Sequence, residues 1–126
     1  MIYEPAEDSY LLEKEVRLRV RDKRILDMGS GKGIQAIAAL EGGALSVLAV
    51  DIYSESVAEL KKKGLNAIQS DLFSKVRGKF DLIIFNPPYL PFDLREDLES
   101  ARVTTGGKKG DEIIIRFLRD AGKHLA

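Results

Sequence analysis

The sequence predicts an α/β protein with a doubly wound, mostly parallel sheet that carries helices on both faces. Two observations lead to this fold class. Short apolar runs of strand length alternate along the chain with longer segments in which apolar residues recur at helical spacing. A cluster of glycines at residues 29–33 follows the first apolar run and opens the next helical segment. A helix between two successive strands is long enough to connect them in parallel, and such crossovers are almost always right-handed. We therefore expect a parallel sheet.

The four strands are expected where the short apolar runs lie. The first run, RILDM, ends at the glycines, the second ends at Asp51, and the third is weaker and ends at Asp71. The fourth contains Leu82 to Phe85, a run that is typical of a strand buried on both faces. The predicted strands are residues 24–28, 45–50, 66–70 and 80–85.

The helices are predicted from apolar spacing and from residues that begin or end helices. Pro5 suits a first helical turn, Ser54 is placed to cap the third helix, and Gly64 ends it. Glu59 and Lys63 are spaced to form an ion pair on that helix. No periodicity holds from residue 86 to about residue 110. The predicted helices are residues 4–20, 34–40, 54–63 and 111–125.

The composition predicts one domain, residues 1–126, with no bulk attraction to polyanions. Lys plus Arg and Asp plus Glu both number 20, so nucleic acid or an anionic membrane would have to bind a local patch. The absence of Cys and the single His argue against a metal site and against a cysteine nucleophile. No apolar run approaches the roughly 20 residues of a membrane span, and the acidic start does not match a signal peptide. We therefore expect a cytoplasmic protein.

Short polar side chains end or follow all four predicted strands. In a doubly wound sheet, ligands bind beyond the carboxyl ends of the strands, where the strand order reverses. Asp and Asn also follow strands because they form turns, so one such residue is weak evidence. Four in succession, with glycines beside the first, favour a binding site. The four residues are Asp27, Asp51, Asp71 and Asn86.

The glycine turn indicates the class of ligand. Gly29, Gly31 and Gly33 allow the backbone to approach a ligand closely at the start of a helix. Their spacing is not that of a dinucleotide fingerprint, and the chain contains no Walker phosphate loop. Asp27, just before the glycines, would repel a pyrophosphate but suits an ammonium group.

The residues at the ends of the second and third strands match the remaining parts of a ligand that has no phosphate. Asp51 is placed to accept both hydroxyls of a ribose, and Asp71 can accept from the exocyclic amine of a purine. Their neighbours Ile52 and Leu72 are assigned to the same site. An amino acid end, a ribose and an adenine without phosphate describe S-adenosylmethionine.

The motif N-P-P-Y follows the fourth strand and predicts the pocket for the group that is modified. Pro87 and Pro88 stiffen the chain, so that the Asn86 amide and a neighbouring carbonyl are held in place. These two acceptors can grip both hydrogens of a planar NH2 group, and Tyr89 offers it a flat apolar face. Asn86 is also assigned to the edge of the cofactor site. The alternative is a proline turn with no functional role.

These motifs resemble those of class I S-adenosylmethionine-dependent methyltransferases with an N-P-P-Y motif, specifically the HemK-like branch that methylates the release-factor glutamine in archaea and eukaryotes. The resemblance rests on Y-E-P-A-E-D-S at residues 3–9, the glycine turn, the strand-end acids, N-P-P-Y and the glycines before the last helix. It implies a Rossmann-like fold, and that Pro5, Glu7 and Ser9 reach the cofactor. It also implies a release factor as the protein substrate and a small zinc-binding activator subunit as a candidate partner.

The resemblance is incomplete at the C-terminal end. Methyltransferases of this class carry a fifth strand and a further hairpin after the helix that ends this chain, so a truncated domain with an uncovered fourth strand is expected. Two alternative functions remain open. A DNA or RNA adenine-N6 methyltransferase would present the same planar amine, although the zero net charge argues against it. A non-catalytic module would bind only the cofactor or a protein partner.

Overall fold

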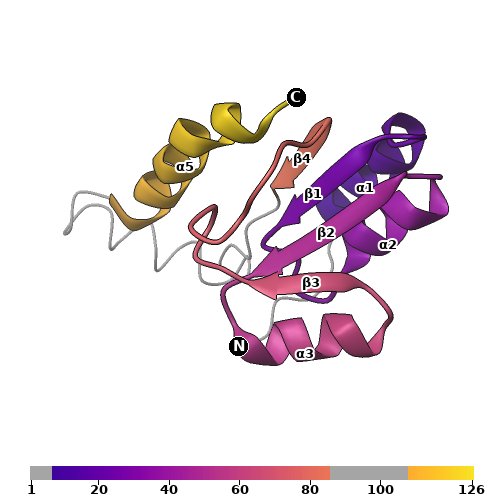
Figure 1. Ribbon diagram of the computed structural model, residues 1–126, viewed down its shortest axis with the longest axis horizontal. Helices are drawn as coiled ribbons and strands as arrows, with labels where there is room; N and C mark the ends of the chain where they lie inside the picture. The colour runs from indigo at the N-terminus through magenta and orange to yellow at the C-terminus, as the bar shows by residue number, and fades with distance from the viewer. Residues whose placement is uncertain (1–6, 86–107) are drawn as a thin grey trace.

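A computed structural model describes residues 7–85 and 108–126 of the chain. Its centre is a four-stranded, fully parallel sheet with the strand order β3-β2-β1-β4 (Figure 1). The strands are β1 (Arg24–Met28), β2 (Ser46–Asp51), β3 (Asn66–Gln69) and β4 (Leu82–Phe85). Successive strands β1, β2 and β3 run outward in one direction, and β4 returns to the other side of β1. The predicted doubly wound fold is confirmed.

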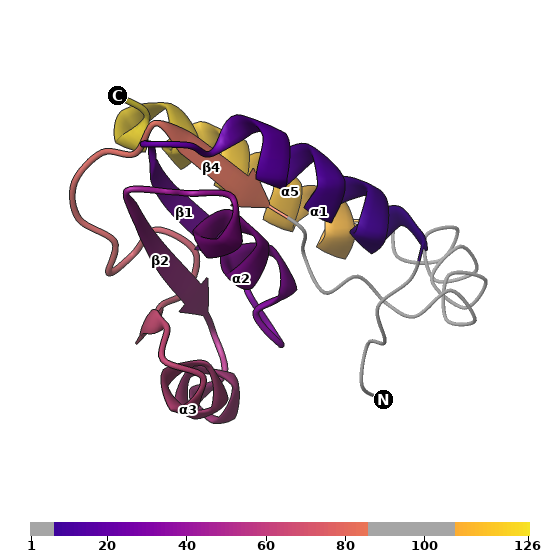
Figure 2. The same cartoon turned by 90° about the vertical axis from the view of Figure 1, so that its right-hand side faces the viewer.

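Helices cover both faces of this sheet (Figure 2). On one face, helices α1 (Glu7–Arg19), α2 (Ile34–Glu41) and α3 (Ser54–Lys62) share a buried cluster with Ile25 and Ile84 of the strands. On the other face, α5 (Lys108–Ala121) contributes Phe117 and Ala121 to a second cluster with Leu26 and Val50. A short 3-10 helix (Gly122–His124) follows α5. None of the helices in the described ranges is long and apolar enough to cross a bilayer.

The sequence located each element, but it misplaced several ends and contacts. Helix α5 spans Lys108–Ala121 rather than residues 111–125, and its predicted last turn is the 3-10 helix Gly122–His124. Ser54 is the first residue of α3 and Tyr53 occupies the cap, with no side-chain cap bond. Glu59 forms its ion pair with Lys62, at 3.6 Å. Lys63 lies beyond the helix, and its Nζ donates to the carbonyl of Lys32 at 2.7 Å.

The fourth strand is shorter than the sequence predicts, because its first residue pairs elsewhere. Phe80 forms an isolated parallel bridge with Leu125. The Phe80 N–H donates to the His124 carbonyl at 2.7 Å, and its carbonyl accepts from Ala126 N–H at 2.8 Å. In the described part of the chain, β4 therefore pairs with β1 along one edge, and the backbone of residues 124–126 pairs only with Phe80, just before β4 begins.

Candidate functional site

The carboxyl ends of β1 and β2 are joined through the glycine turn. Met28 lies opposite Val50 in the sheet, and the N–H groups of Gly29 and Ser30 both donate to the Val50 carbonyl at 2.8 Å. The glycines at 29, 31 and 33 all have positive φ, at 73°, 56° and 85°, which side chains rarely adopt. The turn therefore depends on glycine, and it leads directly into the N-terminus of α2.

Asp51 connects this turn to the exit of β2. Its Oδ2 accepts from the Gly31 N–H at 2.8 Å, and its Oδ1 accepts from the Tyr53 N–H at 3.0 Å. The residue is only 5% exposed. A carboxylate has about four acceptor positions, so both oxygens keep capacity for further donors such as hydroxyl groups. The next residue, Ile52, is apolar and 50% exposed.

Asp27 lies deeper than Asp51. It is 1% exposed, and its Oδ2 accepts from the Ser30 hydroxyl at 2.7 Å. Burial raises the pKa of Asp27 to about 7, against the opposing effect of hydrogen bonds from Ser30 and the Ala36 backbone, while the charge of Asp51 raises it further. The buried carboxylate thus stabilises the glycine turn through its hydrogen bond with Ser30. A contact with an ammonium group would need the carboxylate to be uncovered, so that assignment stays a prediction.

Two glycines of the turn meet different surroundings. A Cβ added to Gly31 would have no heavy atom within 4 Å, so the space beside this residue is open. A Cβ added to Gly33 would lie 2.8 Å from Leu60 Cδ2 and 3.0 Å from Leu65 Cδ1, both buried residues of the core. Gly31 therefore faces available space, whereas Gly33 allows the turn to pack on α3 and the segment after it.

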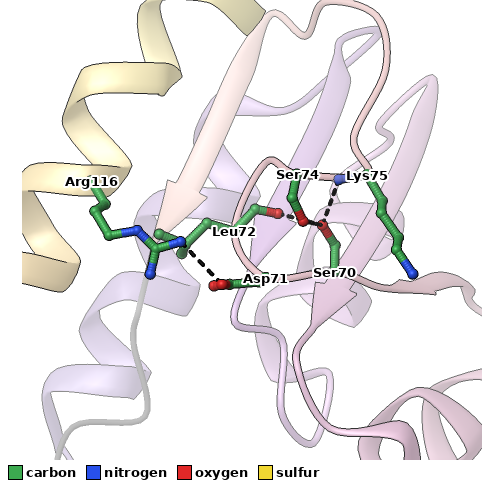
Figure 3. A network of polar contacts seen from close by, with 6 residues as sticks. All are labelled: Ser70, Asp71, Leu72, Ser74, Lys75 and Arg116. Carbon is green, nitrogen blue, oxygen red and sulfur yellow. Dashed lines mark hydrogen bonds and ion pairs between the residues drawn. The ribbon is translucent and has the colours of Figure 1, made fainter.

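The exit of β3 carries a network of polar contacts (Figure 3). The Ser70 hydroxyl donates to the Leu72 carbonyl at 2.7 Å and accepts from the Lys75 N–H at 3.0 Å. Asp71 is exposed, and its Oδ2 accepts from Arg116 of α5 at 3.1 Å. The sequence indicated Asp71 and Leu72 but not Ser70 or Arg116. No local pattern relates Arg116 to Asp71, because the two residues are 45 positions apart.

Phe85, the last described residue before N-P-P-Y, is held by its backbone in the sheet and by its ring against α5. Phe85 pairs with Met28 in the sheet, and its ring stacks on Phe117 of α5 with centroids 4.0 Å apart. The strand order reverses between β1 and β4, so Phe85 lies at the switch point of the sheet. Several predicted site residues lie outside the described residues: Pro5, Asn86, Pro87, Pro88 and Tyr89. Glu7 and Ser9 lie in the first turn of α1, and their side chains are outside the description.

The methyltransferase small domain family matches residues 7–126 of this chain. The chain belongs to this family. It is 41% identical over 132 residues to a putative protein N5-glutamine methyltransferase of Methanocaldococcus jannaschii, an alignment that covers 98% of this chain and 66% of that protein. A release factor glutamine methyltransferase of Lactococcus lactis is 36% identical over 62% of this chain and 32% of its own length. The predicted resemblance to this branch of methyltransferases is confirmed.

The fold of this methyltransferase small domain is also found in solved structures. The ribosomal protein L11 methylase of Lactobacillus delbrueckii subsp. bulgaricus superimposes with a TM-score of 0.70 and 28% identity, over 96% of this chain and 56% of that one. The chain thus spans between about one third and two thirds of the length of these relatives.

Proposed function

We propose that this chain is a methyltransferase domain that uses S-adenosylmethionine to methylate the side-chain amide nitrogen of a protein glutamine. The observation that carries this proposal is the position of Phe85 opposite Met28 at the switch point of the sheet. Asn86 follows Phe85 directly in the sequence, so N-P-P-Y begins after a strand that pairs with the strand entering the glycine turn. Cofactor-binding and substrate-binding motifs thereby start from neighbouring strand ends.

The residues at these strand ends fit the cofactor at its nucleoside end. Asp51 keeps acceptor capacity for ribose hydroxyls, the exposed Ile52 offers an apolar surface for a base, and the space beside Gly31 is open. Asp71 is an exposed acceptor suited to the exocyclic amine of adenine. When bound, S-adenosylmethionine supplies an electrophilic methyl group on a positively charged sulfur.

The role assigned to N-P-P-Y is to hold the nucleophile in place. The Asn86 amide oxygen and a proline-fixed carbonyl accept the two hydrogens of the substrate amide, so that the nitrogen is directed at the methyl carbon. The bond from nitrogen to the methyl carbon forms as the bond from that carbon to sulfur breaks, which leaves S-adenosylhomocysteine, and the nitrogen loses one proton to solvent water, because no acid-base pair is assigned. A release factor with a Gly-Gly-Gln loop is the proposed substrate, and a zinc-binding activator subunit is a candidate partner. The names of the relatives support this substrate class.

The proposed substrate is tested by a labelled-methyl assay. The full chain is incubated with a release factor, with its Gln→Ala variant and with adenine-containing oligonucleotides, each with and without the activator subunit. We expect label on the release factor alone and none on the Gln→Ala variant. Label on the oligonucleotides would support the adenine methyltransferase instead. Binding of S-adenosylmethionine without any transfer would support a non-catalytic module, and calorimetry with NAD serves as the negative binding control.

The matched variants Gly31→Ala and Gly33→Ala are expected to separate ligand binding from folding. Both place a side chain at positive φ, which costs about 1–2 kcal/mol in unfolding free energy. Gly33→Ala should lose about 1–3 kcal/mol more, because its methyl group meets the buried Leu60 and Leu65. Gly31→Ala should instead lose more affinity for S-adenosylhomocysteine, because its methyl group enters the open space.

Urea unfolding and calorimetry measure the two effects of these glycine variants. If Gly31→Ala binds S-adenosylhomocysteine as tightly as the parent chain, the ligand does not occupy the space beside Gly31. If the two variants are equally stable, the packing argument for Gly33 is wrong.

A further inference from the structure

The ion pair between Asp71 and Arg116 joins two parts of the molecule that are distant in sequence. The Arg116 guanidinium, on α5, donates through one nitrogen to Asp71 Oδ2 at 3.1 Å (Figure 3). Both side chains line an open pocket of about 270 Å³, and about half of each is exposed to solvent. A ligand can therefore reach the carboxylate while the ion pair is present.

The backbone at Asp71 is held without help from Arg116. Ser70 before it is buried, its N–H donates to the Asp51 carbonyl at 2.9 Å, and its hydroxyl bonds the Leu72 carbonyl and the Lys75 N–H. Within residues 7–85 and 108–126, Arg116 is the only residue that forms a hydrogen bond or ion pair with the Asp71 carboxylate. The direction of this carboxylate therefore depends on α5.

Arg116 is itself held in place by the residue that follows it. Phe117 is buried, stacks on Phe85 with an interplanar angle of 13°, and lies 5.4 Å from the ring of Phe73, measured between centroids. These contacts attach α5 to the exit of β4 through Phe85 and to the turn after β3 through Phe73. The guanidinium is thus presented to Asp71 from a packed segment of helix, which distinguishes it from an ion pair between two mobile surface side chains.

We propose that Arg116 is a positioning residue for Asp71 and, through it, a determinant of adenine specificity. This inference rests on the proposed use of S-adenosylmethionine. One carboxylate oxygen is occupied by the guanidinium, which limits rotation of the side chain, and the carboxylate keeps acceptor positions for the exocyclic amine of the purine. A purine that carries a carbonyl oxygen in place of that amine presents an acceptor, not a donor, at that position, and its nearest N–H lies on the neighbouring ring nitrogen, where an oriented carboxylate is not directed. The oriented carboxylate therefore discriminates between the two bases.

The test is a double-mutant cycle measured by calorimetry with S-adenosylhomocysteine and its hypoxanthine analogue. The variants are Arg116→Gln, Asp71→Asn and the double variant, with Arg119→Gln as the matched control. Arg119 lies one helical turn further along α5, is exposed, and has no hydrogen bond or ion pair within the described residues. Thermal unfolding checks that each variant is folded, and Arg116→Lys tests whether a single cationic donor restores binding.

We expect Arg116→Gln to weaken binding of S-adenosylhomocysteine about three- to tenfold, the scale of one hydrogen bond, and to reduce the preference for adenine over hypoxanthine. Arg119→Gln should have no effect, and Arg116→Gln should have none when Asp71 is already Asn. An effect of Arg116→Gln that persists with Asp71→Asn, or no effect in the parent chain, overturns the inference. Failure of the parent chain to bind S-adenosylhomocysteine overturns the proposed cofactor instead, and the inference with it.

Discussion

Asn86→Ala is expected to lower the rate of methyl transfer by about two orders of magnitude or more, the usual scale for losing one preorganised polar contact. The affinity for S-adenosylhomocysteine should be largely retained, because the main proposed partner of Asn86 is the substrate amide and its assigned contact with the cofactor is secondary. Rates are measured under single-turnover conditions with labelled S-adenosylmethionine and the substrate identified by the labelling assay, and affinity is measured by calorimetry.

The chain offers a matched control for this variant. Asn66 is the other asparagine, and it lies exposed at the beginning of β3, at the opposite end of the strands from the proposed site. Asn66→Ala should leave the rate unchanged. An Asn86→Ala variant with the parent's rate would mean that N-P-P-Y is only a turn after β4.

Asp27→Asn is expected to remove a large pH dependence of the unfolding free energy. Burial raises the pKa of Asp27 from 3.8 to about 7, so the folded chain binds a proton more tightly than the unfolded chain. The contribution of protonated Asp27 to the unfolding free energy is therefore complete below the unfolded pKa of 3.8. It is lost as the pH rises through about 7. The shift corresponds to about 4 kcal/mol, an order-of-magnitude value, and Asn cannot titrate in this range.

The measurement is urea unfolding of the parent chain and Asp27→Asn between about pH 4 and pH 8. The parent should lose stability relative to the variant as the pH rises. Asp81→Asn is a control of opposite sign, because hydrogen bonds from Arg24 lower the pKa of Asp81, whose contribution is lost as the pH falls. Parallel pH profiles for the parent and Asp27→Asn would contradict the raised pKa.

The sequence predicted those parts of the site that are determined by short sequence patterns. Asp27, Asp51 and Asp71 could be placed at one edge of the sheet because a parallel sheet brings the carboxyl ends of its strands together. The glycine turn was recognisable because positive φ angles at close spacing select glycine.

The contacts between these local features could not be predicted from spacing. Lys63 was assigned to Glu59 by helical spacing, but α3 ends at Lys62, and Lys63 instead reaches the carbonyl of Lys32. The pairing of Arg116 with Asp71 depends on how α5 packs across the sheet, which no short pattern specifies. The depth of Asp27 is likewise a result of packing, and it determines the pKa of that residue.

The position of β4 beside β1 has a consequence for the order of events during folding. β1 and β2 are successive strands that pair with each other, whereas the contact of Arg24 with Asp81, just before β4, closes a loop of 57 positions. Contacts between distant residues carry a larger entropic cost and generally form later. We therefore expect a growing chain to assemble the glycine turn and Asp51 first, and to acquire the neighbouring strand end that leads into N-P-P-Y only afterwards. Cofactor affinity and catalytic competence would then arise at separate stages of the protein's synthesis.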